Sequence, residues 1–307
     1  GGYDPFTFDI TEHISPEGPQ QIKVAVWDIT DAGWYARGKQ LRRPRGIRYT
    51  SVTGIWQTVW VEPVPETSIE SVRITPDTDS SSVKVQINTR GDTEKLEYKV
   101  QVSESNKPVT ENKSWSPGLE TEIPDPKLWS PSEPHLYDLK VSIIAGGQVL
   151  DSVSCYFGMR KVEVRKAEDG FSGIFLNDEP LFQYGLLDQG WWPGGLYTPP
   201  SDEALKYDLE ITTKLGFNML RKHVKVSPSR LYYWCDKLGI LVWQDMPNME
   251  GKVYRDEKDL FVPDYASKQY ELEYKRMIDA LYNHPSIVMW VPFNEGWGQY
   301  DTERIAR

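Results

Sequence analysis

The sequence has 307 residues, a length that predicts two or three domains. With 39% apolar and 26% charged residues it is typical of a globular protein, and no window approaches the roughly 20 apolar residues of a membrane span. The formal net charge of −10 argues against nucleic acid as a partner, because binding a polyanion needs a clustered basic surface. Composition therefore disfavours membrane and nucleic-acid-binding proteins.

Three local features qualify this picture. The one basic cluster, RGKQLRRPRGIR at residues 37–48, is expected to pair with nearby acids or to line a domain contact. Cys155 and Cys235 fall in different predicted domains, so we expect buried free thiols and no disulfide. The chain starts without Met and ends in DTERIAR, the start of a helix that Asp301 can cap, so we expect a fragment. The compartment stays open, with a periplasmic or secreted location favoured over a cytoplasmic one.

The first half of the chain is predicted to be β structure. Residues 1–65 contain two alternating stretches, QIKVAVWD and GIWQTVWVEPVP, the second ending on prolines. From 66 to 164 further alternating strands are spaced by turn signals, which predicts a β-sandwich. These strands are SIESVRI, SVKVQIN, KLEYKVQV, LYDLKVSII and QVLDSVSCYF. Gly146-Gly147 between the last two predicts a two-residue hairpin.

After Gly170, apolar strands alternate with helices. The four predicted strands are PLFQYGLLD, FNMLR, ILVWQD and IVMWV, the first and last read as buried. One helix is capped by Ser201, a second opens at Ser227-Pro228, and a third spans residues 267–283. This order predicts a parallel sheet with helical crossovers, half of a (β/α)₈ barrel. An open doubly wound sheet is the alternative, which the lack of a Gly-rich phosphate loop disfavours.

Polar side chains follow each of the four strands. In a barrel the carboxyl ends of the strands carry the chemistry, so we expect these residues to converge in one mouth. They are Asp188 and Gln189, Arg221 to His223, Gln244 and Asp245, and Asn294 and Glu295. Trp191 and Trp192, in a Pro/Gly-rich loop, are candidates to stack on a sugar ring; the alternative is that they hold the loop onto the barrel.

Several stretches resemble glycoside hydrolase family 2, which includes β-galactosidases, β-glucuronidases and β-mannosidases. They occur in the family's order over essentially the whole chain: GGYDPFTFDIT, SVTGIWQTVWVEPVP, LWSPSEPHLYDLKV, FGMRKVEV, LGFNMLRKH, LYYWCDKLGILVWQD and HPSIVMWVPFNE. The resemblance implies a multidomain β plus α/β fold. Its parts would be a partial jelly-roll sugar-binding domain (1–65), an immunoglobulin-like β-sandwich (66–164) and the N-terminal half of a (β/α)₈ TIM barrel (165–307).

The resemblance also implies roles for single residues. The NE pair places the family's acid/base on Glu295 and the residue that binds the sugar's 2-hydroxyl on Asn294. Arg221 and His223 fall at the family's Arg-X-X-His motif, although one residue separates them here. Asp188, Asp245, Trp191 and Trp192 complete the predicted substrate-binding set.

The second carboxylate is expected to lie outside this chain. A retaining glycosidase needs a nucleophile about 5–5.5 Å from the acid, and the family's nucleophile follows the seventh barrel strand. To donate a proton near neutral pH, Glu295 must hold that proton, which apolar walls from Trp290 and Trp297 would favour. Asp28 or Asp31 could reach the barrel mouth, and the sequence does not choose between them. This chain alone is therefore expected to be inactive.

The resemblance predicts a retaining exo-β-glycosidase, in the first place a β-galactosidase, with β-glucuronidase or β-mannosidase as alternatives. A non-catalytic carbohydrate-binding protein is the alternative class. The partner is a β-linked carbohydrate, and a homo-oligomer is left open. No organic cofactor is needed; family members bind Mg²⁺ or Na⁺, for which Glu250 or Asp245 could supply oxygen ligands, but no metal site is assigned.

Overall fold

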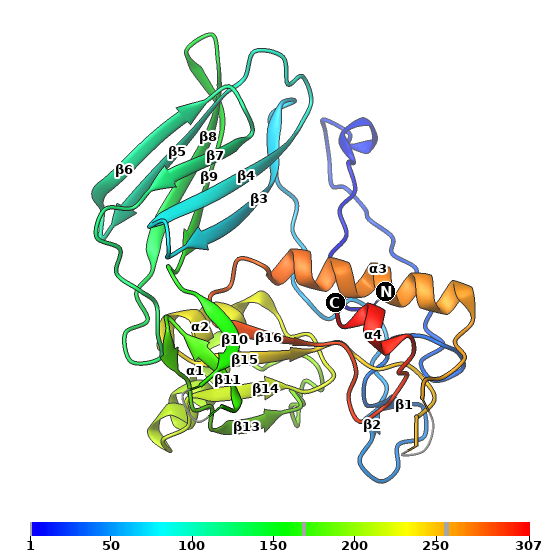
Figure 1. Ribbon diagram of the computed structural model, residues 1–307. Helices are drawn as coiled ribbons and strands as arrows, with labels where there is room; N and C mark the ends of the chain where they lie inside the picture. The colour runs from blue at the N-terminus through cyan, green and yellow to red at the C-terminus, as the bar shows by residue number, and fades with distance from the viewer. Residues whose placement is uncertain (1, 168–169, 255–257) are drawn as a thin grey trace.

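The computed structural model describes residues 2–167, 170–254 and 258–307 (Figure 1). It contains a β-sandwich, a parallel sheet with crossing helices, and an N-terminal segment with little regular structure. None of the helices among these residues is long and apolar enough to cross a membrane. Cys155 and Cys235 are free thiols; Cys235 is buried as expected, whereas Cys155 is half-buried.

The sandwich consists of two antiparallel sheets. The three-stranded sheet has the order β3 (Ser68–Asp77), β4 (Ser82–Arg90), β7 (Gly118–Glu122). The four-stranded sheet has the order β6 (Lys107–Ser114), β5 (Glu97–Glu104), β8 (Tyr137–Ala145), β9 (Gln148–Phe157). Alternate side chains of both sheets meet in one core, as in other sandwiches. The Gly146-Gly147 hairpin is confirmed, since Ala145 pairs with Gln148 and both glycines have positive φ.

The second half forms the predicted parallel sheet. Its strands lie in chain order as β13 (Gly185–Asp188), β14 (Met219–Lys222), β15 (Leu241–Asp245) and β16 (Ile287–Val291). The crossing helices are α1 (Asp202–Lys214), α2 (Ser229–Leu238) and α3 (Asp264–Leu281), followed by α4 (Thr302–Ile305). A small antiparallel sheet of β10 (Val162–Lys166), β11 (Ser172–Leu176) and β12 (Glu179–Pro180) precedes them. The half barrel is thereby confirmed.

Helices α2 and α3 differ from their predicted boundaries, and one predicted side-chain cap does not form. Ser201 caps α1 as predicted, its hydroxyl accepting from Ala204 N at 3.2 Å. Helix α2 starts at Ser229, because Pro228 has extended backbone and acts as the N-cap. Helix α3 starts at Asp264, three residues earlier than predicted. The predicted cap at Asp301 is wrong: this residue has a φ of 40° and makes no side-chain cap bond.

Two strands predicted to be buried are more exposed than expected. Strand β13 lies at the edge of its sheet, where β14 is its only hydrogen-bonded neighbour among the described strands, so Leu187 is 54% exposed. In β16 only Ile287 is fully buried, and the remaining four residues are half-buried. Burial of a parallel strand requires neighbours and cover on both faces, which an apolar run alone cannot guarantee.

The strands predicted within residues 1–65 are wrong. The regular elements described there are η1 (Thr11–His13) and the short parallel pair β1 (Gln40–Leu41) and β2 (Tyr49–Thr50). No jelly-roll layer forms among residues 2–65, and most apolar side chains of the two predicted stretches stay exposed, as Trp27 at 84% shows. A β strand needs a partner for its ladder of hydrogen bonds, and these two stretches have none among the described residues.

The segment around β1 packs against the carboxyl ends of the parallel strands (Figure 1). Arg37 N and Gly38 N donate to Asn248 O at 3.1 and 3.2 Å. Gly38 has a φ of +61°, and a Cβ there would lie 2.3 Å from Val224 O, so only glycine allows this approach. The basic cluster of residues 37–48 is thereby held at the active face of the half barrel.

The sandwich and the half barrel also pack on each other. Trp129 Nε1 donates to Asp236 O at 2.8 Å, and Arg160 Nε donates to Pro285 O at 2.8 Å. Trp129 is completely buried between the two parts, together with Leu241. The half barrel is thus anchored on the side away from its active face.

Candidate active site

An arginine–carboxylate pair joins the ends of β14 and β15. Arg221 Nε and Nη2 donate to Asp245 Oδ1 and Oδ2, both at 2.9 Å. The Asp245 side chain is 1% exposed and also accepts from Val224 N at 3.2 Å. A planar guanidinium on a planar carboxylate fixes both side chains, so this pair is a rigid base for the residues above it.

Asn294 is oriented by this pair. Arg221 Nη2 donates to Asn294 Oδ1 at 2.9 Å, so the amide oxygen faces Arg221 and the amide NH₂ is free to face elsewhere. Asn294 is buried and lines a small depression together with Glu295. The arrangement presents one oriented hydrogen-bond donor, which suits the recognition of a hydroxyl group.

His223 lies on the same side as Arg221. Successive side chains of extended chain point to opposite faces, so residues two apart share one face. His223 Nδ1 is 3.3 Å from Asp245 Oδ2, and the ring lines the depression. Both residues of the predicted arginine–histidine pair therefore contact Asp245 despite the shortened spacing.

Glu295 follows β16 in a left-handed backbone conformation, with a φ of 52°. For a residue other than glycine this conformation costs about 1–2 kcal/mol, and such strain gathers at functional sites. The loop is held by Trp297 N donating to Asn294 O at 2.9 Å and by Gly298 N donating to Gly251 O at 3.0 Å. Glu295 thus lies in a tight turn, Asn294 to Trp297, which the bond to Gly251 ties to the preceding loop.

The depression at Glu295 has a volume of about 20 Å³. Its wall consists of Lys39, Ile47, Arg48, His223, Asn248, Asn294, Glu295 and Trp297. Glu295 is exposed as a residue, yet it lies beside His223 and Asn294 on the active face. Of the predicted aromatic walls, Trp297 takes part, while Trp290 does not line the depression.

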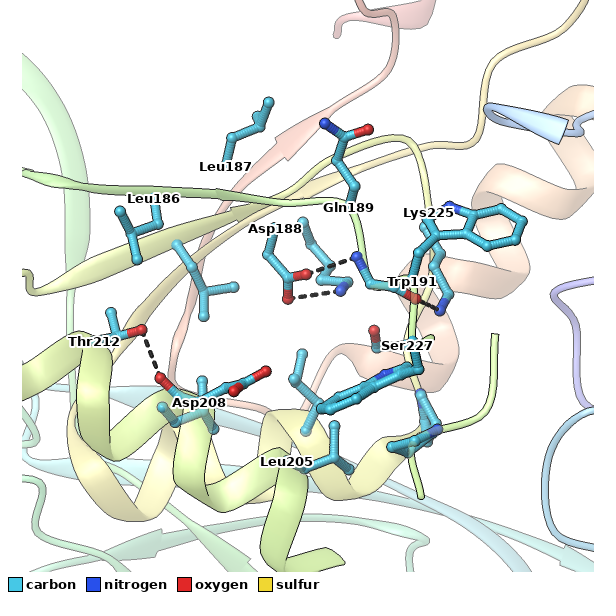
Figure 2. Close-up of a pocket in the computed structure, with 18 of the residues that line it drawn as sticks. Leu186, Leu187, Asp188, Gln189, Trp191, Leu205, Asp208, Thr212, Lys225 and Ser227 are labelled. Atoms are coloured by element: carbon cyan, nitrogen blue, oxygen red, sulfur yellow. Dashed lines mark hydrogen bonds and ion pairs between the residues drawn. The ribbon is translucent and has the colours of Figure 1, made fainter. Parts of the chain in front are cut away.

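Three of the residues predicted to bind substrate, Asp188, Trp191 and Trp192, line a different cavity. This cavity has a volume of about 480 Å³ and lies between β13 and the helices α1 and α2 (Figure 2). Asp188 accepts from Lys222 Nζ and from Gly190 N, both at 2.7 Å. Burial acts to raise the pKa of Asp188, but the Lys222 ammonium holds it below its usual value.

The expectation of a single mouth is therefore wrong. Arg221 and Lys222 are neighbours on β14, so their side chains leave opposite faces of the sheet. Asp188 pairs with Lys222 in the β13–β14 register and joins it on the helix side, whereas Arg221 reaches Asp245 and Asn294. The larger cavity lies on the face away from Glu295.

Trp191 already has aromatic partners. Its ring stacks on Tyr49 with centroids 4.4 Å apart and an interplanar angle of 18°, and it contacts Tyr197 at 4.6 Å. Trp192 N donates to Leu196 O at 2.8 Å within the loop. These contacts tie the loop to itself and to the N-terminal segment. Both tryptophans also pack against the core cluster of the half barrel, in agreement with the second of the two roles considered; stacking on sugar stays a prediction.

The acids considered as cation ligands are engaged by arginines. Asp245 is held by Arg221, and Glu250 Oε2 is 2.5 Å from Arg37 Nη2. Within the described ranges no group of three or more His, Cys, Asp or Glu side chains is arranged to hold a metal ion. These two residues do not fit the Mg²⁺ or Na⁺ site that the family resemblance implied.

Neither Asp28 nor Asp31 reaches the depression. Asp28 Oδ2 accepts from Thr53 Oγ1 at 2.8 Å, and Asp31 Oδ1 accepts from Arg42 Nε at 2.6 Å. Both carboxylates therefore serve contacts within the N-terminal segment, and the polar residues of that segment which line the depression are cationic.

Sequence reasoning missed three polar residues that line the depression: Lys39, Arg48 and Asn248. Lys39 and Arg48 belong to the basic cluster of residues 37–48. The sequence predicted that this cluster pairs with nearby acids or lines a domain contact, but not that it lies beside Glu295. That expectation agrees with the ion pairs Arg37–Glu250 and Arg42–Asp31.

A β-sandwich joined to parallel β/α units, with polar side chains gathered after the strands, defines a barrel protein with its site at the carboxyl face. Two family models agree. The model of glycosyl hydrolases family 2 matches residues 67–160, and the model of the TIM barrel domain of that family matches residues 201–307. The chain belongs to glycosyl hydrolases family 2.

Curated relatives carry two different names. A "putative beta-glucuronidase" of Formosa agariphila is 27% identical over 99% of this chain and 28% of its own length. A "beta-galactosidase" of Thermoanaerobacter pseudethanolicus is 29% identical over 98% of this chain and 40% of its own length. The chain thus spans well under half the length of these relatives.

Solved structures with the same fold include β-glucuronidases. The enzyme from Ruminococcus gnavus in complex with C6-substituted uronic isofagomine has a TM-score of 0.68 and 23% identity, over 79% of this chain and 40% of that one. The enzyme from Dictyoglomus thermophilum has a TM-score of 0.63 and 22% identity, over 74% of this chain and 38% of that one. At such identities the likeness establishes the fold alone.

Proposed function

We propose that the protein is a retaining exo-β-glycosidase in which Glu295 is the proton donor. The observation that carries the proposal is the position of Glu295 after β16, beside an Asn294 amide that Arg221 and Asp245 hold in place. Membership of a glycosidase family supports the reaction class. The strained backbone at Glu295 is a second, independent feature of a functional residue.

The chemistry assigns a role to each of these side chains. Glu295 protonates the oxygen of the leaving group while a second carboxylate, about 5–5.5 Å away, attacks the anomeric carbon and forms a glycosyl-enzyme. Glu295 then removes a proton from the water that releases the sugar. The Asn294 amide donates to the sugar's 2-hydroxyl. The nucleophile is proposed to lie outside these 307 residues, since the relatives extend well beyond the matched part.

Two substrate classes are candidates. β-Galactosides are the first, in agreement with relatives named beta-galactosidase, and β-glucuronosides are the second, in agreement with relatives named putative beta-glucuronidase. β-Mannosides are the remaining class within the family resemblance. The cationic side chains at the depression favour an acidic sugar over a neutral one.

A panel of aryl β-glycosides given to the whole protein that contains this chain tests the proposal. We expect hydrolysis with retained anomeric configuration, followed by NMR. Glu295→Gln should slow substrates with poor leaving groups far more than those with good ones, because only the former need the proton.

The matched control is Glu303→Gln, which alters an exposed glutamate paired with Arg307. It should leave all rates unchanged. Binding of saccharides without cleavage of any of them would overturn the proposal in favour of a non-catalytic carbohydrate-binding protein. So would equal rates of Glu295→Gln and wild type on a poor leaving group.

A further inference from the structure

Cationic side chains surround the aromatic ring next to Glu295. The Arg48 guanidinium lies over Trp297, 4.3 Å from the ring centroid, and Lys252 Nζ is 5.1 Å from the same centroid. Arg48 Nη1 also donates to Gly38 O at 3.1 Å. Arg48 is thus fixed by a ring and a carbonyl, and among the described residues its remaining N–H groups have no hydrogen-bond partner, so they can meet a ligand.

The charges in the wall of the depression do not cancel. Lys39 and Arg48 contribute two cations, and Glu295 contributes the one carboxylate of the wall. Among the described residues no carboxylate forms a close ion pair with either cation, and Glu250, which acts on Arg48 from a distance, is already paired with Arg37. When Glu295 carries the proton it is to donate, both cations face the depression without compensation.

Partial burial makes it costly to leave both cations without a counter-charge. Burial lowers the pKa of Lys39, and the neighbouring Arg48 lowers that pKa further. Burial also lowers the pKa of Arg48, with Arg37 as the next cause. An anion placed between two partly desolvated cations relieves both effects, so the depression is electrostatically complementary to a negative group.

The other basic residues of the segment are arranged differently. Arg37 pairs with Glu250 and Arg42 pairs with Asp31, while Arg43 is exposed and does not line the depression. The depression itself, at about 20 Å³, has room for roughly one water-sized group. That size fits one oxygen of an anionic substituent better than a sugar ring.

We propose that Lys39 and Arg48 form a subsite for an anionic group of the substrate, a carboxylate or a sulfate ester. The subsite rests on the proposed function, since it lies beside the proposed proton donor. It is built by the N-terminal segment, which Gly38 and Asn248 seat on the half barrel. The substrate is then an acidic glycoside.

Matched pairs of substrates test this subsite on the whole protein. 4-Nitrophenyl β-glucuronide is compared with the β-glucoside, and the 6-sulfate of 4-nitrophenyl β-galactoside with the unsulfated compound. A third pair moves the anion to the leaving group, as in 4-carboxyphenyl and phenyl β-galactoside. Lys39→Met and Arg48→Met should each lower kcat/KM for the anionic member of the preferred pair roughly 10- to 100-fold. The ratio of kcat/KM between the anionic and the neutral member should fall by a similar factor, and Arg43→Met is the control with the same loss of charge.

Binding measurements separate this proposal from the proposed function. The probe is D-glucuronic acid against D-glucose, followed by calorimetry on the same variants. Tighter binding of the acid, lost in Lys39→Met but kept in Arg43→Met, supports the subsite even in a protein that cleaves nothing. Hydrolysis of neutral glycosides, with no preference for the anionic member of any pair and no effect of either variant, would overturn the subsite and leave the glycosidase proposal standing.

Discussion

Arg221 and Asp245 form a two-bond ion pair across neighbouring strands, with each carboxylate oxygen 2.9 Å from a guanidinium nitrogen. The same guanidinium holds Asn294. The pair therefore connects the stability of the sheet to the orientation of a proposed substrate-binding amide.

Replacement of Arg221 by Met is expected to destabilise the protein strongly. It leaves Asp245, 1% exposed, as a buried charge without its cation, which lowers the free energy of unfolding by roughly 3–5 kcal/mol. Denaturant titration measures the change. Arg230→Met is the control, because the Arg230–Asp202 pair is exposed and is worth under about 1 kcal/mol. Equal losses of unfolding free energy in the two variants would contradict the expectation that the buried Arg221–Asp245 pair matters more to stability than an exposed pair.

Gly38→Ala is expected to release the N-terminal segment from the half barrel. Its Cβ would lie 2.3 Å from Val224 O in a backbone with a φ of +61°. Gly46→Ala provides the control, since Gly46 has a φ of +57° and nothing within 4 Å of the added Cβ. Hydrogen exchange should accelerate over residues 37–49 in Gly38→Ala alone. Similar exchange in both variants would mean that strain, and not the contact, governs the segment.

Lys225 is expected to make stability rise with pH above neutrality. Burial, followed by the Lys222 ammonium, lowers the pKa of Lys225 to about 7, while Asp188 opposes the shift. Because the pKa of an unfolded lysine is about 10.4, the unfolded state binds more protons between these values and stability increases with pH.

The free energy of unfolding of the wild type should therefore rise between pH 7 and 9, by at most about 1.4 kcal/mol per pH unit. Lys225→Met should lack this part of the slope. The groups packed around the ammonium are Tyr197, Trp56 and the Gly190 carbonyl, none of which changes charge in this range. Parallel curves for the two proteins would show that Lys225 stays protonated throughout.

Ser201→Ala is expected to lower stability by about 1 kcal/mol, because it removes the hydroxyl that caps α1. Ser229→Ala, at the exposed start of α2 where no side chain caps the helix, should change stability by less than about 0.5 kcal/mol. Thermal unfolding of both variants measures the difference. A similar small effect in both would mean that the Ser201 hydrogen bond contributes little.

A protein made of these 307 residues alone is expected not to hydrolyse aryl β-glycosides. The proposed proton donor Glu295 then lacks the nucleophile that the mechanism requires. The measurement is release of aryl alcohol under single-turnover and steady-state conditions. Release that Glu295→Gln abolishes would place the nucleophile within this chain.

The sequence by itself determined the parts of the fold that depend on local pattern. Alternating runs predict β3, β4, β5, β8 and β9 of the sandwich and the hairpin between the last two, because a half-buried strand repeats every two residues. Strands β6 and β7 were not predicted. Apolar runs separated by capped helices predict the parallel sheet in the observed order. The polar residues after each strand follow from the same reading, and Arg221, Asp245, Asn294 and Glu295 do lie together or line one depression.

The tertiary structure alone decided which of these residues share a site. Whether alternating stretches within residues 1–65 become strands depends on partners for their hydrogen bonds, which no local pattern encodes. Asp188 and Glu295 line different cavities. Asp188 pairs with Lys222 on one face of β14, whereas the depression at Glu295 lies on the face from which Arg221 projects. Lys39 and Arg48 lie beside Glu295 because Gly38 packs on Val224, a contact between distant parts of the chain. Contacts of that kind are set by packing between elements, so they cannot be inferred from the periodicity within one.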